Sequence, residues 1–349
     1  MNRFLKTIWP IFCLCAFIAG IVLLGLQAYQ TGEILLFAIG VVLGMAVAPI
    51  VHECGHIIAA QSVQMECVYC KVFCLQAKRY GEKMKWSFTS PFAEDQTQVM
   101  PTKAGNMRER VIRYTLGGLL ASGMVLLLLF VAILFPWRIQ WLCLGMILYN
   151  GYLFLMNVIP VAYSAGKTDM LIYKGLKTGA DTEETMLTAM EIQGQLFEGK
   201  RFSEIEARLY QTPPICEDEP LFLMMLDLQY RHELDSGNLE GAAKHLNRLA
   251  ELQDYLGQEE LLSVAAELVY MHSQTRDLES TQLNWEICKD YLSRETATSK
   301  RISAAYHFAC GDMEQGEVLR LEGLRLCEQE RVKGLALFEK TLLQNQYGE

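Results

Sequence analysis

Residues 52–56 read HECGH, which places His52 and His56 four residues apart with Glu53 between them. Residues four apart lie on one face of an α-helix, so both imidazoles can bind a single Zn²⁺. Glu53 then lies beside the metal, where a carboxylate serves as general base. Catalytic zinc also needs a third protein ligand and an open fourth position. The motif therefore predicts one Zn²⁺ per chain.

The HECGH motif ends a long apolar segment. No charged residue occurs between Ile34 and Val51, and about 18 residues of helix from Glu33 span roughly 27 Å, close to the thickness of the hydrocarbon core. Ionisable side chains at that depth are costly without a partner, and a metal ion is the simplest one. The alternative is that the motif has left the membrane and begins a solvated loop. The apolar run Ile57–Ala60 favours a continued helix.

Few acidic residues in the first half of the chain could complete this site. Asp169 follows the fourth apolar segment after a short turn that contains Gly166, and such a turn can return the chain to the same edge of the membrane. Asp169 is therefore the predicted third zinc ligand. Apart from Glu53, the other acidic residues of this half are Glu33, Glu66, Glu82, Glu94, Asp95 and Glu109.

Together these motifs resemble the site-2 protease family of intramembrane zinc metalloproteases. The family's HExxH is present, and Asn157-Val-Ile-Pro160 followed by Asp169 is similar to its Asn-x-x-Pro element and later Asp. The stretch RYTLGGLLAS at residues 113–122 looks like the family's small-residue helix start, which permits close packing. The resemblance covers roughly residues 33–175 and implies a three-helix catalytic core.

The resemblance also implies a reaction. In such proteins zinc and the motif glutamate hydrolyse peptide bonds in or near transmembrane segments of membrane-anchored peptides or regulatory proteins. Carried over by position, Asn157 becomes a substrate-positioning residue, although a polar residue in a membrane helix can equally bond a neighbouring helix. The chain departs from the family pattern at two points. Met170 stands where the family usually has Gly, and eight residues separate Pro160 from Asp169.

The membrane prediction rests on four apolar segments that approach or exceed the roughly 20 residues needed to cross a hydrocarbon core. Residues 1–179 hold 15 Lys and Arg against 8 Asp and Glu, whereas residues 180–349 hold 16 against 32. This asymmetry indicates a membrane domain with basic flanks, joined to an acidic, water-soluble domain. The four segments are Ile8–Gln27, Ile34–Ala59, Tyr114–Phe135 and Ile139–Tyr163.

The same charges predict the orientation. Basic residues are concentrated before the first segment and in residues 60–113, whereas the loops at 28–33 and 136–138 carry almost none. By the positive-inside rule, the N-terminus, residues 60–113 and everything after Tyr163 are cytoplasmic. The sequence thus predicts a multi-pass protein of a bacterial-type plasma membrane, in contact with the lipid bilayer, with both termini in the cytoplasm.

Residues Met65–Phe92 alternate apolar and polar side chains around a turn at Tyr80–Glu82, which predicts a small β-hairpin between the second and third segments. An exposed edge there could receive a substrate backbone as an added strand, or the strand could lie on the membrane surface. Cys67, Cys70 and Cys74 fall in the same region. Three thiols without a clear fourth partner are a weak zinc signal, and a half-buried strand is the simpler interpretation.

The fold class that follows is an all-α polytopic membrane protein with about four transmembrane helices, a small β-hairpin and a C-terminal α-helical solenoid-like domain. The boundary is expected at residue 179, giving domains 1–179 and 180–349. In the second domain Gly237–Ala242, Arg276–Thr281 and Gly311–Gly316 align, and 200–204 is a looser match. These spacings suit a degenerate tetratricopeptide-type array that binds a protein partner, although a simple helical bundle would also fit.

Other functional classes fit less well. The net charge of −9 argues against a nucleic-acid partner. Gly166-Lys-Thr168 is not a P-loop because the pattern requires Gly at position 161, which is Val161. Four spans without inverted repeats disfavour a transporter. The competing interpretation is a catalytically inactive membrane scaffold that binds partners through its helical domain.

Overall fold

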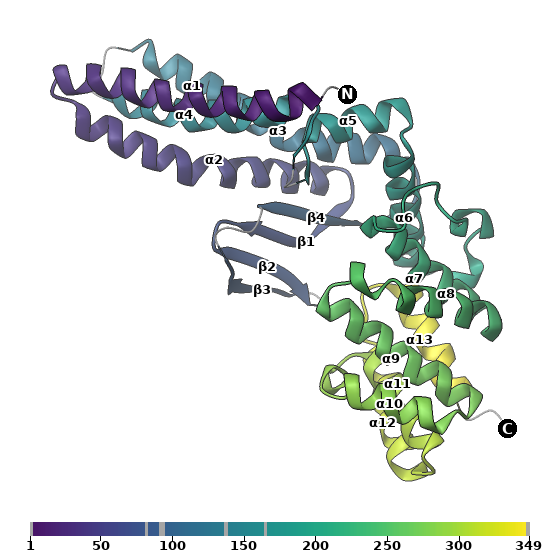
Figure 1. Cartoon of the computed structure of the whole chain (residues 1–349). Helices are drawn as coiled ribbons and strands as arrows, with labels where there is room; N and C mark the ends of the chain where they lie inside the picture. Colours follow the sequence, from purple (N-terminus) through teal and green to yellow (C-terminus); the bar gives the residue numbers. More distant parts are fainter. Residues whose placement is uncertain (1–2, 81–82, 91–94, 136–138, 164–165, 347–349) are drawn as a thin grey trace. The chain divides into compact units, whose positions relative to one another are not determined.

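The computed structural model describes residues 3–80, 83–90, 95–135, 139–163 and 166–346 (Figure 1). The chain forms two compact units. The first comprises Met1–Met100 and Asn106–Glu183, and the second comprises Pro101–Gly105 and Glu184–Glu349. The division thus falls four residues after the expected boundary at residue 179. The short segment Pro101–Gly105 belongs to the second unit although it lies within the first half of the sequence.

The first unit is mostly helical, with a small sheet between its second and third helices. Helices α2, α3 and α4 pack against one another, and α1 packs mainly on α4 (Figure 1). The elements are α1 (Arg3–Gln30), α2 (Ile34–Ser62), β1 (Met65–Val72), β2 (Leu75–Tyr80), β3 (Lys83–Phe88), β4 (Gln96–Pro101), α3 (Met107–Ile133), α4 (Ile139–Val158), β5 (Ala162–Tyr163), β6 (Gly166–Lys167) and α5 (Asp169–Thr178).

Helices α1 to α4 are each long and apolar enough to cross a membrane, as the sequence predicts. Large apolar side chains on their outer faces stay exposed: Leu23 is 64%, Val42 66% and Leu120 68% exposed. In water such a surface would be unfavourable, because burying apolar area is the main driving force of folding. Exposed apolar side chains along membrane-length helices are instead typical of surfaces that contact lipid.

Only the starts at Ile34 and Ile139 coincide with the predicted segment ends, and the start of α3 and the end of α4 are among the largest differences. Helix α3 begins at Met107, seven residues before the expected start. In this added part the buried Arg110 side chain donates hydrogen bonds to the carbonyls of Val63 (2.7 Å) and Gln64 (2.6 Å), just after α2. Helix α4 ends at Val158. Proline disfavours helical backbone at the residue before it, so Pro160 ends the helix earlier than the apolar pattern suggests.

The glycine of HECGH allows α2 to pack closely on α3. A Cβ on Gly55 would lie 2.5 Å from the carbonyl oxygen of Gly117, and a Cβ on Gly117 would lie 2.5 Å from that of Gly55. Only glycine permits this backbone approach, which is the usual use of small residues between membrane helices. The contact brings the motif directly against α3.

The predicted hairpin is present as β2 and β3, which pair in antiparallel register from Leu75 opposite Phe88 to Tyr80 opposite Lys83. Its turn residues, 81–82, lie outside the described part of the chain. The hairpin belongs to a larger sheet than predicted, with strand order β3-β2-β1-β4. Strand β1 follows α2 after two residues, and β4 is at the other end of the sheet. The chain is therefore mostly helical, with a four-stranded sheet in place of a lone hairpin.

From Glu184 onward, the regular elements of the second unit are all helices in the part that the structure describes. Helix α6 begins in the first unit and continues into the second; α7 then packs on α8, α9 on α10, and α11 on α12. The elements are α6 (Asp181–Glu198), α7 (Pro220–Asp235), α8 (Leu239–Glu251), α9 (Gln258–Thr275), α10 (Leu278–Cys288), α11 (Ala297–Ala309), α12 (Met313–Cys327) and α13 (Lys333–Asn345), with short 3-10 helices at Phe202–Glu204, Ala207–Tyr210, Gln253–Tyr255 and Tyr291–Ser293.

The three aligned sequence segments occupy equivalent places in this unit. Each contains the turn into the second helix of a pair, and Asn238, Asp277 and Asp312 cap α8, α10 and α12 by accepting a hydrogen bond from the backbone N–H three residues later. The looser fourth segment, 200–204, instead contains a 3-10 helix. The repeat in the sequence thus marks where helices begin, while a continuous solenoid remains a prediction.

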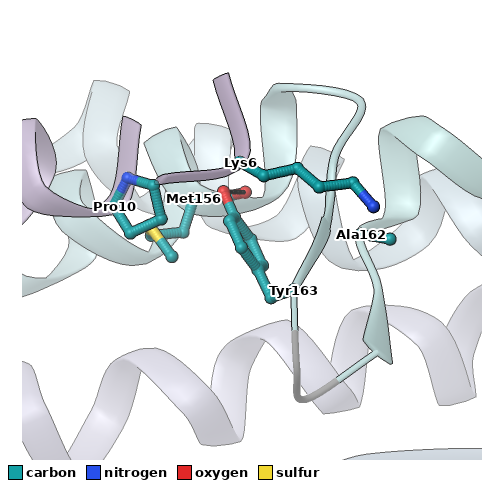
Figure 2. Close-up of a pocket in the computed structure, with 5 residues that line it drawn as sticks. All are labelled: Lys6, Pro10, Met156, Ala162 and Tyr163. Carbon is teal, nitrogen blue, oxygen red and sulfur yellow. Dashed lines mark hydrogen bonds between the residues drawn. The ribbon is translucent and has the colours of Figure 1, made fainter. Parts of the chain in front are cut away.

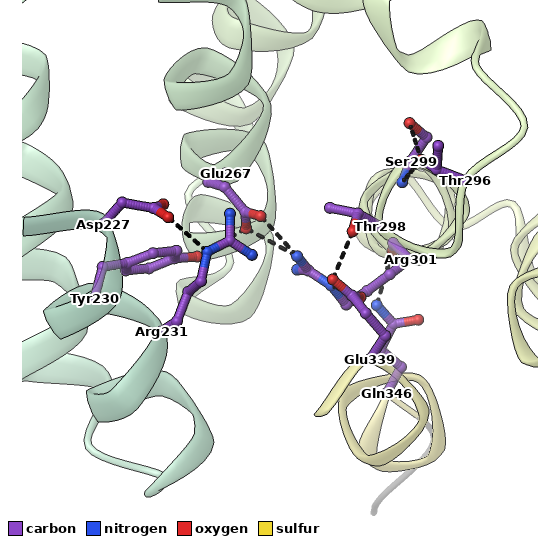
Figure 3. Close-up of polar contacts among 10 residues, drawn as sticks. All are labelled: Asp227, Tyr230, Arg231, Glu267, Thr296, Thr298, Ser299, Arg301, Glu339 and Gln346. Atoms are coloured by element: carbon purple, nitrogen blue, oxygen red, sulfur yellow. Dashed lines mark hydrogen bonds and ion pairs between the residues drawn. The ribbon is translucent and has the colours of Figure 1, made fainter. Parts of the chain in front are cut away.

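Buried charges join α9, α11 and α13 (Figure 3). The Arg301 side chain of α11 is fully buried, and it pairs with Glu267 of α9 (2.8 Å) and Glu339 of α13 (2.7 Å). The Tyr230 hydroxyl donates a hydrogen bond to Glu267 (2.8 Å). Burial alone would raise the pKa of Glu267, but Arg301 and Arg231 outweigh it and lower that pKa. The Glu267 carboxylate therefore stays ionised beside the Arg301 guanidinium.

We expect Arg301→Ala to loosen this unit strongly, because it leaves two buried carboxylates without their cation. Breaking a buried ion pair costs about 3–5 kcal/mol. Hydrogen exchange measured by mass spectrometry on the whole protein should then show α9 and α11 exchanging at least about 100-fold faster. The matched control is Arg248→Ala, which removes exposed pairs with Glu217 and Glu251 and should change exchange only slightly. Equal effects in both variants would contradict the assignment.

Candidate metal centre

Three sequence-predicted ligands meet at one point of the first unit. His52 and His56 lie on consecutive turns of α2, and Asp169 is the first residue of α5. The two Nε2 atoms are 3.3 Å apart, and Oδ2 of Asp169 lies 3.2 Å from Nε2 of His52 and 3.4 Å from Nε2 of His56. All three side chains are largely buried. No other group of three or more His, Cys, Asp or Glu side chains among the described residues is placed to hold a metal ion.

The spacing of these three atoms suits a tetrahedral zinc ion. With zinc–ligand bonds of about 2.05 Å, two ligands of a tetrahedron lie about 3.3 Å apart. The observed separations of 3.2, 3.3 and 3.4 Å match those expected for three ligands on one face of such a tetrahedron. Oδ2 of Asp169 is buried and has no hydrogen-bond donor among the described residues. The donor set and its spacing therefore fit zinc.

Helix α3 orients both imidazoles. Nδ1 of His56 lies 2.9 Å from the carbonyl oxygen of Tyr114, and Nδ1 of His52 lies 3.1 Å from Oγ of Ser122. A carbonyl can only accept, so Nδ1 of His56 carries the proton and the lone pair of the neutral ring is on Nε2. Metal-binding histidines are commonly oriented by this kind of contact from the other ring nitrogen. The Tyr114 and Ser122 contacts were not foreseen from the sequence.

Asp169 is positioned by the residue before it. The buried Thr168 side chain caps α5, donates a hydrogen bond to the carbonyl of Ile159 (2.8 Å) and accepts one from the N–H of Val161 (3.2 Å). The longer spacing between Pro160 and Asp169 is explained by strands β5 and β6, which pair and return the chain. Met170 lies in regular helix without a positive φ, so this fold needs no glycine there.

The charge state of Asp169 suits a ligand. Burial raises the pKa of this carboxyl, but the neighbouring His52 and His56 outweigh burial and lower the pKa to about 2. Asp169 is thus a carboxylate at neutral pH, as metal binding requires.

Glu53 lies on the same helix, one residue after His52, and its side chain is buried. The Thr97 hydroxyl of β4 donates a hydrogen bond to Oε2 of Glu53 (2.6 Å), and the Tyr114 hydroxyl donates one to the carbonyl of Thr97 (2.5 Å). The sheet therefore holds the carboxylate beside the metal ligands. Nothing in the local sequence around Thr97 indicates this role, because the contact spans 44 residues.

The three ligands and Glu53 line one cavity of about 540 Å³ within the first unit. Asn157, in the last turn of α4, lines it too, but its Nδ2 donates to the carbonyl of Leu153 in its own helix (3.2 Å). Neither a bond to a neighbouring helix nor a contact with the three ligands is present in the described structure, so a substrate-positioning role stays a prediction. Other side chains around the cavity come from Pro49, Asp95, Gln96, Thr97, Tyr114, Tyr149, Tyr163, Lys167 and Ile172.

The three cysteines of the sheet region do not form a metal site in the described structure. Cys67 and Cys70 lie on β1, where Cys67 is buried and Cys70 is half-buried, while the exposed Cys74 lies beyond the strand. All three are free thiols. The half-buried strand, the simpler of the two sequence interpretations, is what the structure contains.

Comparisons of the chain with protein-family models, with curated proteins and with solved structures find no match. The resemblance to site-2 proteases thus rests on the motif residues alone.

Proposed function

We propose that the protein is a zinc-dependent intramembrane protease. Its substrates would be membrane-anchored peptides or regulatory proteins, cleaved in or near their transmembrane segments. One observation carries this proposal. The candidate ligand atoms of His52, His56 and Asp169 lie 3.2 to 3.4 Å apart, and Glu53 lines the same cavity, which membrane-length helices border. One Zn²⁺ per chain would be held by His52, His56 and Asp169.

The chemistry divides between the metal and the side chains. When bound, zinc supplies Lewis acidity that activates water and polarises a substrate carbonyl. Glu53 takes the proton from the attacking water and delivers it to the leaving amine, which a carboxylate fixed in one position can do in turn. Thr97 holds that carboxylate by its 2.6 Å hydrogen bond. The amide of Asn157, on the wall of the same cavity, would orient the substrate.

The sheet offers a place for an extended substrate. Strand β4 is at one end of the sheet order, and Gln96 and Thr97 at its start line the cavity. A peptide added along the outer edge of β4 would run past Glu53, with main-chain hydrogen bonds setting its register. This arrangement would present an unwound segment of the substrate to the metal.

The membrane setting is part of the proposal. We infer that α1 to α4 span a plasma membrane, with the N-terminus, the sheet and everything after α4 on the cytoplasmic side. The excess of Lys and Arg in residues 60–113 supports this orientation. Because the motif lies near the end of α2, hydrolysis would occur close to the cytoplasmic boundary of the hydrocarbon core.

The acidic helical domain would recruit or regulate substrates. Residues 180–349 carry a net charge of −16 from 16 basic and 32 acidic residues, and helix pairs of this kind commonly present a surface to a peptide or protein. A basic segment of a protein partner would complement that charge. No nucleic acid is proposed as a partner.

Zinc stoichiometry tests the metal centre. We expect about one zinc per chain by elemental analysis of detergent-purified protein, and sharply less in His56→Ala and Asp169→Ala, because each removes one of three protein ligands. Gln96→Ala is the matched control, since the exposed Gln96 lines the same cavity but lies outside the ligand group. Wild-type protein without zinc, purified without chelators, would favour the scaffold interpretation instead.

Thr97→Val should slow cleavage about tenfold while zinc stays bound, because it removes one hydrogen bond to the charged Glu53. The measurement is the rate of cleavage of a transmembrane peptide at saturating concentration. Thr97→Ser restores the hydroxyl and should recover most of the rate. Loss of zinc from Thr97→Val would contradict a positioning role and indicate structural damage.

A further inference from the structure

A second cavity of about 490 Å³ lies between the start of α1 and the end of α4 (Figure 2). Lys6 and Pro10 come from α1, Met156 from α4, and Ala162 and Tyr163 from β5. Tyr163 also lines the cavity that contains His52, His56, Asp169 and Glu53. Its hydroxyl donates a hydrogen bond to the carbonyl of Met156 (3.3 Å). His52, His56 and Asp169 are not among the residues that line this second cavity.

The walls of this cavity combine a cation with apolar surface. The ammonium of Lys6 supplies the charge, and Pro10 and Met156 supply apolar surface. The site therefore offers a cationic donor for a phosphate oxygen beside apolar side chains.

The surroundings indicate where such a ligand comes from. Ile11 and Phe12, which follow Pro10 on α1, are 55% and 56% exposed and continue the apolar surface of the helix outward. The Trp9 indole donates a hydrogen bond to the carbonyl of Leu155 (3.1 Å), which ties α1 to α4 beside the cavity. A soluble anion would leave the apolar wall uncovered, whereas a lipid covers it with its acyl chains.

We propose that this cavity binds an anionic glycerophospholipid. Its phosphate lies at Nζ of Lys6, and the acyl chains run along Pro10, Met156 and the exposed face of α1. The inference rests on the proposed membrane insertion, but it does not depend on zinc or on catalysis.

Lipid retention tests the proposal. Detergent-purified full-length protein is mixed with phosphatidylglycerol or phosphatidylcholine, and bound lipids are counted by native mass spectrometry. We expect preferential retention of one phosphatidylglycerol, weakened about fivefold by Lys6→Gln, the effect of one basic residue near an anionic lipid. The matched control, Lys174→Gln, removes an exposed charge of α5 and should leave retention unchanged. Equal loss in both variants would show general charge attraction and overturn the site.

Two further arms separate the alternatives. Met156→Trp fills the apolar wall with Lys6 intact and should also reduce retention, whereas unchanged retention would show that the acyl chains lie elsewhere. Added glycerophosphate should not displace the lipid, and displacement would identify a soluble-anion site instead. Zinc content is measured in the same samples, so that failure of the lipid site can be told apart from failure of the metal centre. Lipid binding can be lost while zinc stays bound, and zinc can be lost while lipid stays bound.

Discussion

Glu53→Gln is expected to abolish peptide cleavage while leaving about one zinc bound per chain. The substitution keeps the size and shape of the side chain and removes the carboxylate that accepts the proton. The three ligand atoms lie on other residues, so the metal centre should persist. Loss of a general base lowers turnover by about 10²- to 10⁴-fold.

The measurement uses a pool of synthetic transmembrane peptides, with cut products identified by mass spectrometry and zinc determined on the same protein. Glu109→Gln is a suitable control, since Glu109 lies in the first turn of α3, outside the cavity. Cleavage retained by Glu53→Gln would contradict the role of Glu53 as general base. Loss of zinc together with cleavage would instead show that Glu53 supports the fold of the site.

Gly118→Ala is expected to destroy the metal centre although residue 118 is not a ligand. A Cβ there would lie 2.8 Å from Cε1 of His52 and would also collide with Nε2 of His56. Both rings would have to move away from Asp169, and the three ligand atoms would no longer form a face of a tetrahedron. Displacing oriented ligands costs about 100-fold in metal affinity.

The control for this prediction lies on the same helix. A Cβ on Gly123 would lie 3.4 Å from the ring of Phe154, an ordinary contact, so Gly123→Ala should keep zinc and activity. Zinc titration against a competing chelator measures both variants. Unchanged affinity in Gly118→Ala would show that α3 does not confine the histidines as described.

Local pattern was enough to predict part of this protein. The apolar runs predicted four membrane-length helices because helix length and hydropathy are properties of contiguous residues. His52 and His56 were identified because residues four apart share a helix face whatever the rest of the fold does. Glu53 was identified by its place between them in the motif. Asp169 was selected by its place after the fourth helix, and the structure brings it to the two histidines.

The remaining contacts at the site depend on tertiary structure. Ser122, Thr97 and Gly118 lie 44 to 70 residues from the side chains they touch. The small residues at 113–122 indicated close packing, but not that Gly118 and Ser122 contact the two histidines. Sheet size was underestimated for the same reason: pairing of β4 with β1 joins segments about 25 residues apart, which alternation within one segment does not reveal. The sequence by itself determined which residues could bind the metal, because that depends on chemistry and helical spacing. Only the tertiary structure decided how those residues are oriented and confined, because that depends on neighbours brought in from distant parts of the chain.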